Sequence, residues 1–165
     1  DRLLIRDRKS EICGDFVSMN VVIKDDIDNV DADIYLMTHT TNPLLSKNSV
    51  ECAISQFKDA LKDKTANSLF TVNKAQERFY DSNAKALNHD PENLVRTQDL
   101  EPWYQENSNL YLFTKEGFSQ TNARIGSKPM MLETPPYEST DIDTPDDWDL
   151  AEVMVEYYRK KGVIQ

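Results

Sequence analysis

Short apolar runs alternate with amphipathic stretches along this chain, and this alternation constrains the fold more than any other feature of the sequence. Strand-like runs lie at 34–37, 68–72, 110–113 and 130–132. Strands that alternate with helices at short spacing are typical of an α/β layer structure with a largely parallel sheet. We therefore predict one α/β domain over residues 1–165.

Helical stretches lie between these runs. Helical spacing predicts one helix with Phe16, Met19, Ile23 and Ile27 on a single face, after a turn and N-cap at Gly14-Asp15. Ser46 is the predicted N-cap of a second helix, whose stripe is Val50, Ile54, Phe57 and Leu61. Thr144 and Pro145 begin a final helix. Its predicted buried stripe is Trp148, Ala151, Val155 and Tyr158.

The chain opens on an apolar run at 3–6, which predicts a strand already in progress. Because residue 1 is not Met, we expect the natural chain to begin further upstream. Residues 74–107 break the alternation: they are polar and contain Asp90-Pro91 and Glu101-Pro102. Excursions of this length between core strands more often have a function than not.

Charge and composition exclude several classes. The net charge is −10 over 165 residues and there is no block of Lys or Arg, which argues against nucleic-acid binding. No apolar run approaches the roughly 20 residues that a membrane span needs. The first 30 residues lack the apolar core of a signal peptide, and we expect a cytoplasmic protein. Cys13 and Cys52 are expected to be reduced, partly buried thiols, at no spacing that suits zinc with the histidines.

The acidic segment at 139–147 contains an Asp-Ile-Asp sequence. In an extended segment, residues i and i+2 point to the same side, so the carboxylates of Asp141 and Asp143 can converge on one Mg²⁺. Alternatively, both carboxylates satisfy backbone donors at a turn. The spacing also resembles a calcium-binding EF-hand loop, but Asp146 stands where that loop requires Gly.

Two further polar segments suit a ligand. The loop at 38–43 follows a strand and contains His39 and Asn42, whose side chains can hydrogen-bond a base or sugar, or alternatively cap the next helix. Arg96 suits a carboxylate, and Asn107 and Tyr111 suit sugar hydroxyls. By default, Arg96 would be a surface residue and Tyr111 a core residue.

Four segments, taken in order, resemble the acylneuraminate (CMP-sialic acid) cytidylyltransferase family along nearly the whole chain. Thr-Asn-Pro-Leu at 41–44 matches the family's Thr-Ser/Asn-Pro-Leu loop. Residues 96–100 are similar to its Arg-Gln-Asp-Leu stretch with one extra residue, and residues 107–111 to its Asn-Gly-Ala-x-Tyr strand entry. The most specific match is Asp-Ile-Asp-Thr-Pro-Asp-Asp-Trp at 141–148, with Asp146 in place of Glu.

The resemblance implies a three-layer, nucleotide-diphospho-sugar-transferase-like (Rossmann-like) fold and a CMP-sugar synthetase. Such enzymes join CTP to a nonulosonic (sialic-type) acid and release pyrophosphate. By resemblance, Asp141 and Asp143 are the catalytic residues and the Mg²⁺ ligands. The implied substrate-binding residues are His39, Asn42, Arg96, Gln98, Asn107 and Tyr111. The excursion at 74–105 corresponds to a dimerisation arm, so a homodimer is expected.

The chain also departs from the family. It lacks the Gly-Ser-Lys-rich nucleotide-binding loop with which the family opens, Ser108 replaces a Gly, and Asp81 falls where relatives often have Lys. Arg124-Ile125 falls where some bacterial relatives carry paired aromatics. These departures leave open another nonulosonate, such as a legionaminate, a pseudaminate or, more distantly, 3-deoxy-manno-octulosonate. They also leave open a different class, a non-catalytic dimeric remnant that binds a sugar acid.

Overall fold

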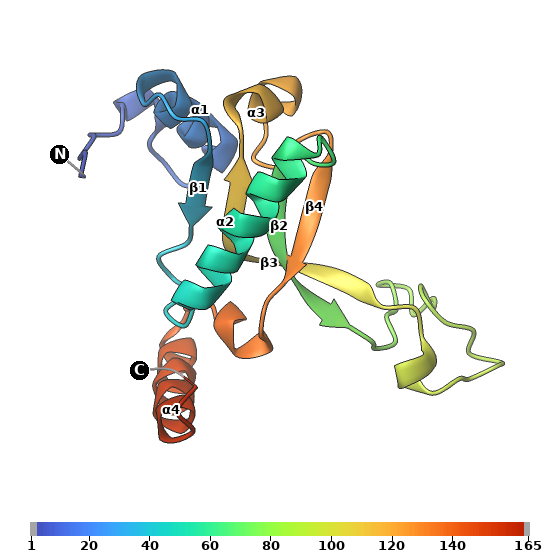
Figure 1. The fold of residues 1–165 in the computed structure, drawn as a ribbon. Coiled ribbons are helices and arrows are strands. Elements are labelled where there is room, and N and C mark those ends of the chain that lie inside the picture. The colour runs from blue at the N-terminus through green and yellow to red at the C-terminus, as the bar shows by residue number, and fades with distance from the viewer. Residues whose placement is uncertain (1–2, 164–165) are drawn as a thin grey trace. The chain divides into compact units, whose positions relative to one another are not determined.

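A computed structural model describes residues 3–163 (Figure 1). Its α-helices are α1 (Met19–Asn29), α2 (Lys47–Lys62), α3 (Lys115–Thr121) and α4 (Pro145–Lys160). Its strands are β1 (Tyr35–Thr38), β2 (Ser68–Ala75), β3 (Trp103–Phe113) and β4 (Pro129–Glu133). Three short 3₁₀ turns are η1 (Ser10–Ile12), η2 (Thr97–Asp99) and η3 (Pro136–Ser139). The α/β class predicted from the sequence is confirmed.

The strands form one open sheet in the order β1-β3-β2-β4. β2 and β4 are parallel, because residue numbers increase in the same direction along both strands from one hydrogen bond to the next. The N–H of Asn67 donates to the carbonyl of Lys128, and the N–H of Thr134 donates to the carbonyl of Val72. The arrows of β1, β2 and β4 point the same way in Figure 1, whereas β3 points the opposite way.

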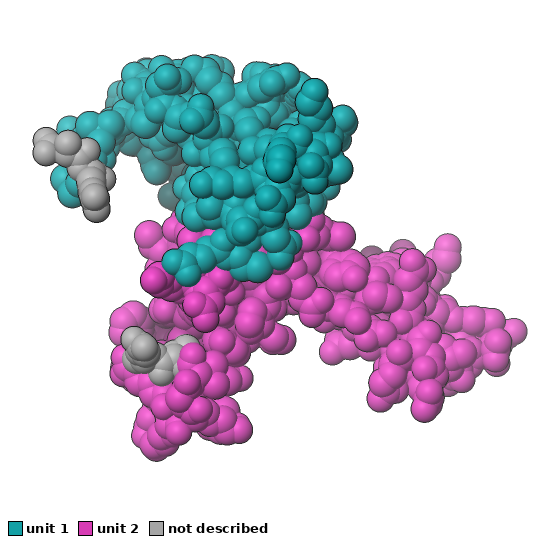
Figure 2. Space-filling model, viewed as in Figure 1, with its two compact units in different colours: residues 1–37, 51–70, 110–130 teal, residues 38–50, 71–109, 131–165 magenta. Residues whose placement is uncertain are grey.

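The chain divides into two compact units (Figure 2). Unit 1 comprises residues 1–37, 51–70 and 110–130, and unit 2 comprises residues 38–50, 71–109 and 131–165. Each unit is assembled from three separate stretches of chain. Neither unit is therefore a contiguous segment that a linear sequence reading could separate from the other.

Unit 1 contains an aromatic and aliphatic core. Ile23 and Ile27 of α1 pack with Tyr111, Phe113 and Phe118, and half-buried hydrophobic residues surround them. Full burial of one such side chain contributes roughly 1.5–3 kcal/mol. These buried positions of α1 confirm the helical stripe in part. The N-cap, however, is Ser18, whose Oγ accepts the N–H of Asn20, and not Asp15.

The N-terminal part of the prediction needs two corrections. Phe16 precedes α1 and is fully exposed, so it does not belong to the buried stripe. Residues 3–6 form no strand in the described structure, and the side chains of Leu3, Leu4 and Ile5 are exposed. A β-strand is defined by backbone hydrogen bonds to a neighbouring strand, and residues 3–6 form none in the described structure. Arg6 instead forms an ion pair with Asp25 at 2.6 Å.

Helix α2 begins as predicted, because Ser46 Oγ accepts the N–H of Ser49 at 3.1 Å. Phe57 is fully buried and the other stripe residues are half-buried. Two features were not predicted. β3 begins at Trp103, inside the excursion, and the short helix α3 follows it with Thr114 as N-cap.

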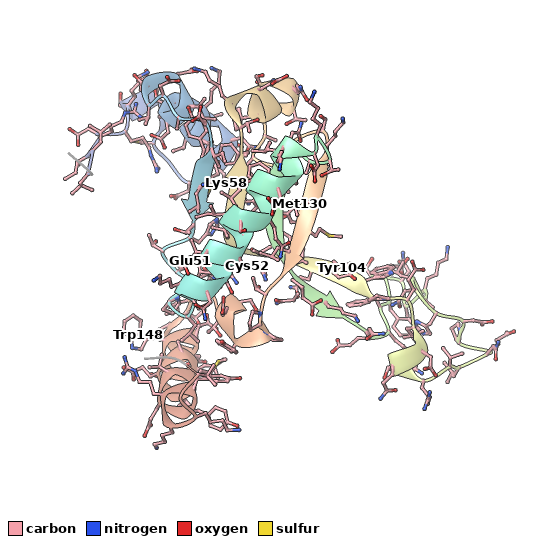
Figure 3. All side chains as sticks on the ribbon, viewed as in Figure 1. Glu51, Cys52, Lys58, Tyr104, Met130 and Trp148 are labelled. Carbon is pink, nitrogen blue, oxygen red and sulfur yellow. The ribbon has the colours of Figure 1, made fainter. Side chains whose placement is uncertain are left out.

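Helix α4 confirms its predicted start and corrects one face. Thr144 is the N-cap and Pro145 occupies the first turn. Ala151 is buried, but Trp148 is 57% exposed and lies outside the buried stripe (Figure 3). Cys13 and Cys52 are free thiols, exposed rather than partly buried. Within residues 3–163, no helix is long and apolar enough to cross a membrane.

Candidate functional site

The Asp-Ile-Asp segment of unit 2 is fixed to the loop that follows β1. The N–H of Ile142 donates to the carbonyl of Thr41 at 3.0 Å, and Asn42 Nδ2 donates to the carbonyl of Thr140 at 3.4 Å. Two motifs almost 100 positions apart in the sequence are thus adjacent in the fold. Both were predicted to contribute to one site, and the structure brings Asn42 and the Asp141 segment together.

The acidic residues of this segment differ in what they bind. Asp147 Oδ2 accepts the N–H of Thr144 at 2.8 Å, its hydroxyl at 2.7 Å, and the N–H of Asp143 at 3.2 Å. These bonds from Thr144 and Asp143 hold the pKa of the Asp147 carboxyl below its ordinary value. Asp147 therefore forms the capping box of α4 together with the N-cap Thr144. Asp143 is exposed and Asp141 is half-buried.

Several buried oxygen atoms of unit 2 have no hydrogen-bond donor among the described residues. They are Asn42 Oδ1, Asn109 Oδ1, Glu138 Oε2 and Asp141 Oδ1. Buried acceptors in folded proteins are almost always satisfied by protein, water or a ligand. Asp141 and Asn42 belong to the two motifs joined by the Thr41–Ile142 bond, so this region holds two buried oxygens that water or a ligand can satisfy.

A network of amide and hydroxyl side chains connects the strands of unit 2. Asn107 Nδ2 donates to Asn73 Oδ1 at 3.0 Å and to Thr134 Oγ1 at 2.8 Å. Asn109 Nδ2 reaches the same Thr134 hydroxyl at 3.4 Å. Asn73 Nδ2 donates to Ser139 Oγ at 2.8 Å. The amide of Asn107, predicted to contact a sugar, is thus engaged inside the protein, and a ligand would have to compete for it.

The backbone conformation of Ser108 suits glycine, the residue that stands at this point in the family that the sequence resembles. The φ of Ser108 is 57°, in the left-handed region that glycine adopts without steric cost. The kink lets Asn107 Oδ1 accept the N–H of Asn109 two residues on, at 3.3 Å. Both flanking asparagine side chains then meet at Thr134.

Arg96 and Gln98 lie in the excursion and do not join this network in the described structure. Arg96 is 79% exposed at its side chain and binds Asp99 through two parallel bonds of 2.8 and 3.0 Å. Gln98 lies in η2, and its carbonyl accepts Gln76 Nε2 at 3.2 Å. Figure 1 shows their segment projecting away from α4. A role at the Asp141 site would require another copy of the chain or a movement of the arm.

Tyr111 and His39 have different environments. Tyr111 was predicted to contact substrate, but its side chain is fully buried in the core of unit 1. The Arg124 guanidinium lies 3.8 Å above its ring, a favourable cation–π geometry. A ligand would reach Tyr111 only after these side chains moved. His39 follows β1 and is half-buried.

Sequence reasoning missed Asn73 and Thr134, and it included Asn109 and Ser139 only as members of the segments 107–111 and 139–147. One signal was present: Asn107 and Asn109 lie two residues apart in a strand and therefore share a face. Glu138 was also missed, and its side chain is 1% exposed. Burial, and secondarily the nearby charge of Glu138, raises the pKa of the Tyr137 hydroxyl.

Asp141 and Asp143 are the carboxylates of this segment that would hold Mg²⁺. No group of three or more His, Cys, Asp or Glu side chains within the described range is placed to hold a metal ion. Mg²⁺ differs from zinc in this respect, because one or two carboxylates suffice when phosphate and water complete its shell. The buried, unsatisfied Oδ1 of Asp141 is a hard oxygen ligand of the required kind.

Solved structures share this α/β fold. The 4-diphosphocytidyl-2C-methyl-D-erythritol synthase of Anaerococcus prevotii superposes with a TM-score of 0.57 at 10% identity, covering 84% of this chain and 67% of that one. A CMP:2-keto-3-deoxy-manno-octonic acid synthetase complexed with CTP gives 0.52 at 16% identity, covering 88% and 70%. At these identities the likeness concerns the fold.

The family follows from the sequence. The family model described as cytidylyltransferase matches residues 6–158, and the chain belongs to this family. Its members are nucleotidyltransferases that use CTP, and this chain is assigned to that class. A search of curated protein sequences finds no match.

Proposed function

We propose that the chain transfers CMP from CTP to a nonulosonic acid, giving a CMP-sugar and pyrophosphate. Membership of the cytidylyltransferase family supports the nucleotide. The observation that carries the proposal is the anchored Asp-Ile-Asp segment, in which Asp141 retains a buried oxygen with no donor among residues 3–163. The sugar class rests on the resemblance of this motif and of its ordered companions to the acylneuraminate enzymes.

Asp141 and Asp143 are the proposed ligands of Mg²⁺. When bound, the ion neutralises charge on the triphosphate and on the developing pyrophosphate. A cation is needed because the protein carries a net charge of −10 and both proposed substrates are anions. The hydrogen bonds to Thr41 and Thr140 fix the backbone on either side of Asp141, so the segment that carries its carboxylate is held before the nucleotide arrives.

In the proposed reaction, the anomeric hydroxyl of the sugar acid attacks the α-phosphorus of CTP. A new oxygen–phosphorus bond forms, the bond from the α-phosphorus to the bridging oxygen of the β-phosphate breaks, pyrophosphate leaves, and the proton of the hydroxyl is released to water. Asn42 is proposed to orient a substrate group through its buried Oδ1, which has no donor within the described residues. His39, Gln98 and Arg96 are proposed to contact the sugar acid, with Arg96 at its carboxylate because its planar fork binds carboxylates through two bonds.

The same proposal includes a homodimer formed through the arm at 74–105. Exposed apolar side chains on this arm support it. Tyr80 is 52% exposed, Leu87 50%, Trp103 41% and Tyr104 44%. Aromatic residues are enriched at interface centres, and an exposed cluster of them marks an interaction surface. Dimerisation is also the arrangement that would bring Arg96 to a neighbouring active site.

A substrate panel tests the proposed function. The natural protein carrying this chain is incubated with Mg²⁺, one nucleoside triphosphate and one sugar acid, and both pyrophosphate and nucleotide-sugar are measured. We expect CMP-sugar only with CTP, and with one acid among N-acetylneuraminate, legionaminate and pseudaminate; 3-deoxy-manno-octulosonate is the comparison acid. Product with the octulosonate alone would refute the sialic-type assignment. A protein that binds a sugar acid without turnover would refute the enzymatic one.

A further inference from the structure

Asn73 and Ser139 connect the end of β2 to the segment that carries Asp141. Asn73 Nδ2 donates to Ser139 Oγ at 2.8 Å, and Ser139 lies two residues before Asp141. Both side chains are half-buried, so the bond is partly shielded from water. Nothing in the sequence motif itself pointed to Asn73, which lies 68 positions before Asp141.

Both side chains are fully committed in this arrangement. Asn73 Oδ1 accepts Asn107 Nδ2 at 3.0 Å, which fixes the orientation of the Asn73 amide. The Ser139 hydroxyl donates to the carbonyl of Pro136 at 2.7 Å while it accepts from Asn73. A continuous chain of donors therefore runs from Asn107 through Asn73 and Ser139 to the backbone of η3, and successive bonds in such a chain strengthen one another.

The Asn73–Ser139 bond is one of several contacts that hold the Asp141 segment. Ile142 is held by Thr41 on one side, and Asp143 is held through Asp147 at the start of α4. Both contacts act at or after residue 142. Before Asp141, the Thr140 carbonyl accepts Asn42 Nδ2 at 3.4 Å, and the Thr140 hydroxyl donates to the Tyr137 carbonyl at 3.1 Å. The Asn73–Ser139 bond acts before Asp141 and is anchored on the sheet. Groups that orient metal ligands without touching the metal commonly govern its affinity.

We propose that Asn73 is a positioning residue for the carboxylate pair, acting through Ser139. The inference rests on the proposed Mg²⁺ site at Asp141 and Asp143. Loss of the Asn73 amide should leave the carboxylates present but loosen the backbone before Asp141, where the longer Asn42–Thr140 bond of 3.4 Å remains. Metal affinity should then fall although neither ligand has changed.

The test measures Mn²⁺ binding to the full protein by electron paramagnetic resonance, which requires no turnover. Asn73→Ala and Ser139→Ala should each weaken Mn²⁺ affinity about tenfold, in the range found for groups that orient metal ligands. Ser139→Thr keeps the hydroxyl and should restore affinity close to that of the wild type. The double variant should bind no more weakly than either single variant, because each single change already removes the Asn73–Ser139 bond.

Asn67→Ala is the matched control. Asn67 is a half-buried asparagine of unit 1 that donates to Gln120 and Ser127, and its loss should not change Mn²⁺ affinity. Circular dichroism checks that each variant is folded, and if Asn73→Ala is not, the two Ser139 variants decide. Wild-type affinity in a folded Ser139→Ala, or additive losses in the double variant, would overturn the positioning role. Mn²⁺ binding unchanged by Asp141→Asn would instead overturn the metal site itself.

Discussion

Replacement of Ser108 by glycine is predicted to stabilise the protein. The φ of Ser108 is 57°, where an L-residue costs about 1–2 kcal/mol through contact of Cβ with the backbone. Glycine removes that cost but loses about 0.4–1 kcal/mol through greater freedom of the unfolded chain. The expected net gain in the free energy of unfolding is about 0.5–1 kcal/mol.

Urea unfolding followed by circular dichroism measures this gain. With a denaturant slope of about 2 kcal/mol per molar, the midpoint should rise by about 0.3–0.5 M at an unchanged slope. Asn122→Gly is the matched control, because its φ is 53° but asparagine tolerates this conformation and the gain should be smaller. Ser108→Ala keeps the backbone cost and should give no gain. A lower midpoint for Ser108→Gly would show that the serine side chain outweighs the backbone strain and would refute the reasoning.

Three further predictions concern charge and assembly. The pKa of Asp147 is lower in the folded protein than its ordinary value of 3.8, so its carboxylate stabilises the fold at pH values above 3.8. This contribution is lost as the pH falls through the lower pKa of the folded state. Asp147→Asn should therefore make the melting temperature fall less steeply at acid pH, and an unchanged acid limb of the melting profile would contradict this. Asp99→Asn should lower the KM for the sugar acid about twofold to fivefold by freeing Arg96 from an exposed ion pair worth under about 1 kcal/mol; an unchanged KM would remove Arg96 from the site. Trp103→Ala should shift light-scattering mass from two chains toward one at micromolar concentration, and a wild type already at one chain would refute the dimer.

Local signals in the sequence predicted most elements of the fold. The start of α4 was readable because the Thr144 cap and Pro145 act within one turn. β1, β2 and β4 were found within about three residues of their bounds as short apolar runs. Strand pairing is not local. Residues 3–6 have strand-like composition but no partner strand in the described structure, and the polar Gln105 and Glu106 concealed the first part of β3.

The buried face of α4 was harder to predict than its start. Trp148 fits the helical spacing of Ala151 and Val155, yet it is 57% exposed. Helical spacing predicts which face of the helix a side chain lies on. It does not predict whether neighbouring residues cover that face along its whole length. The sequence does not predict an inward-facing Met154, whose Sδ accepts a hydrogen bond from the Thr140 hydroxyl at 3.3 Å.

The candidate site divides in the same way. The Asp141 and Asp143 pair belongs to a contiguous motif, and the sequence predicts it as a site together with the Asn42 loop. The network of Asn73, Asn107 and Ser139 joins residues 34 to 66 positions apart, and no local pattern signals it. Tyr111 was assigned to substrate because of its motif, although its complete burial follows from its place in an apolar strand.

Formation of CMP-sugar by aspartate variants of the natural protein tests the central claim most directly. The rate is measured at limiting Mg²⁺ for the wild type, Asp143→Asn and Asp146→Asn. Asp146 is an exposed residue in the first turn of α4 and serves as the control. The account predicts near-complete loss of product for Asp143→Asn, with an unchanged melting temperature, and a rate close to wild type for Asp146→Asn. Normal turnover by Asp143→Asn and by Asp141→Asn would contradict it, because the pair would then be a structural turn.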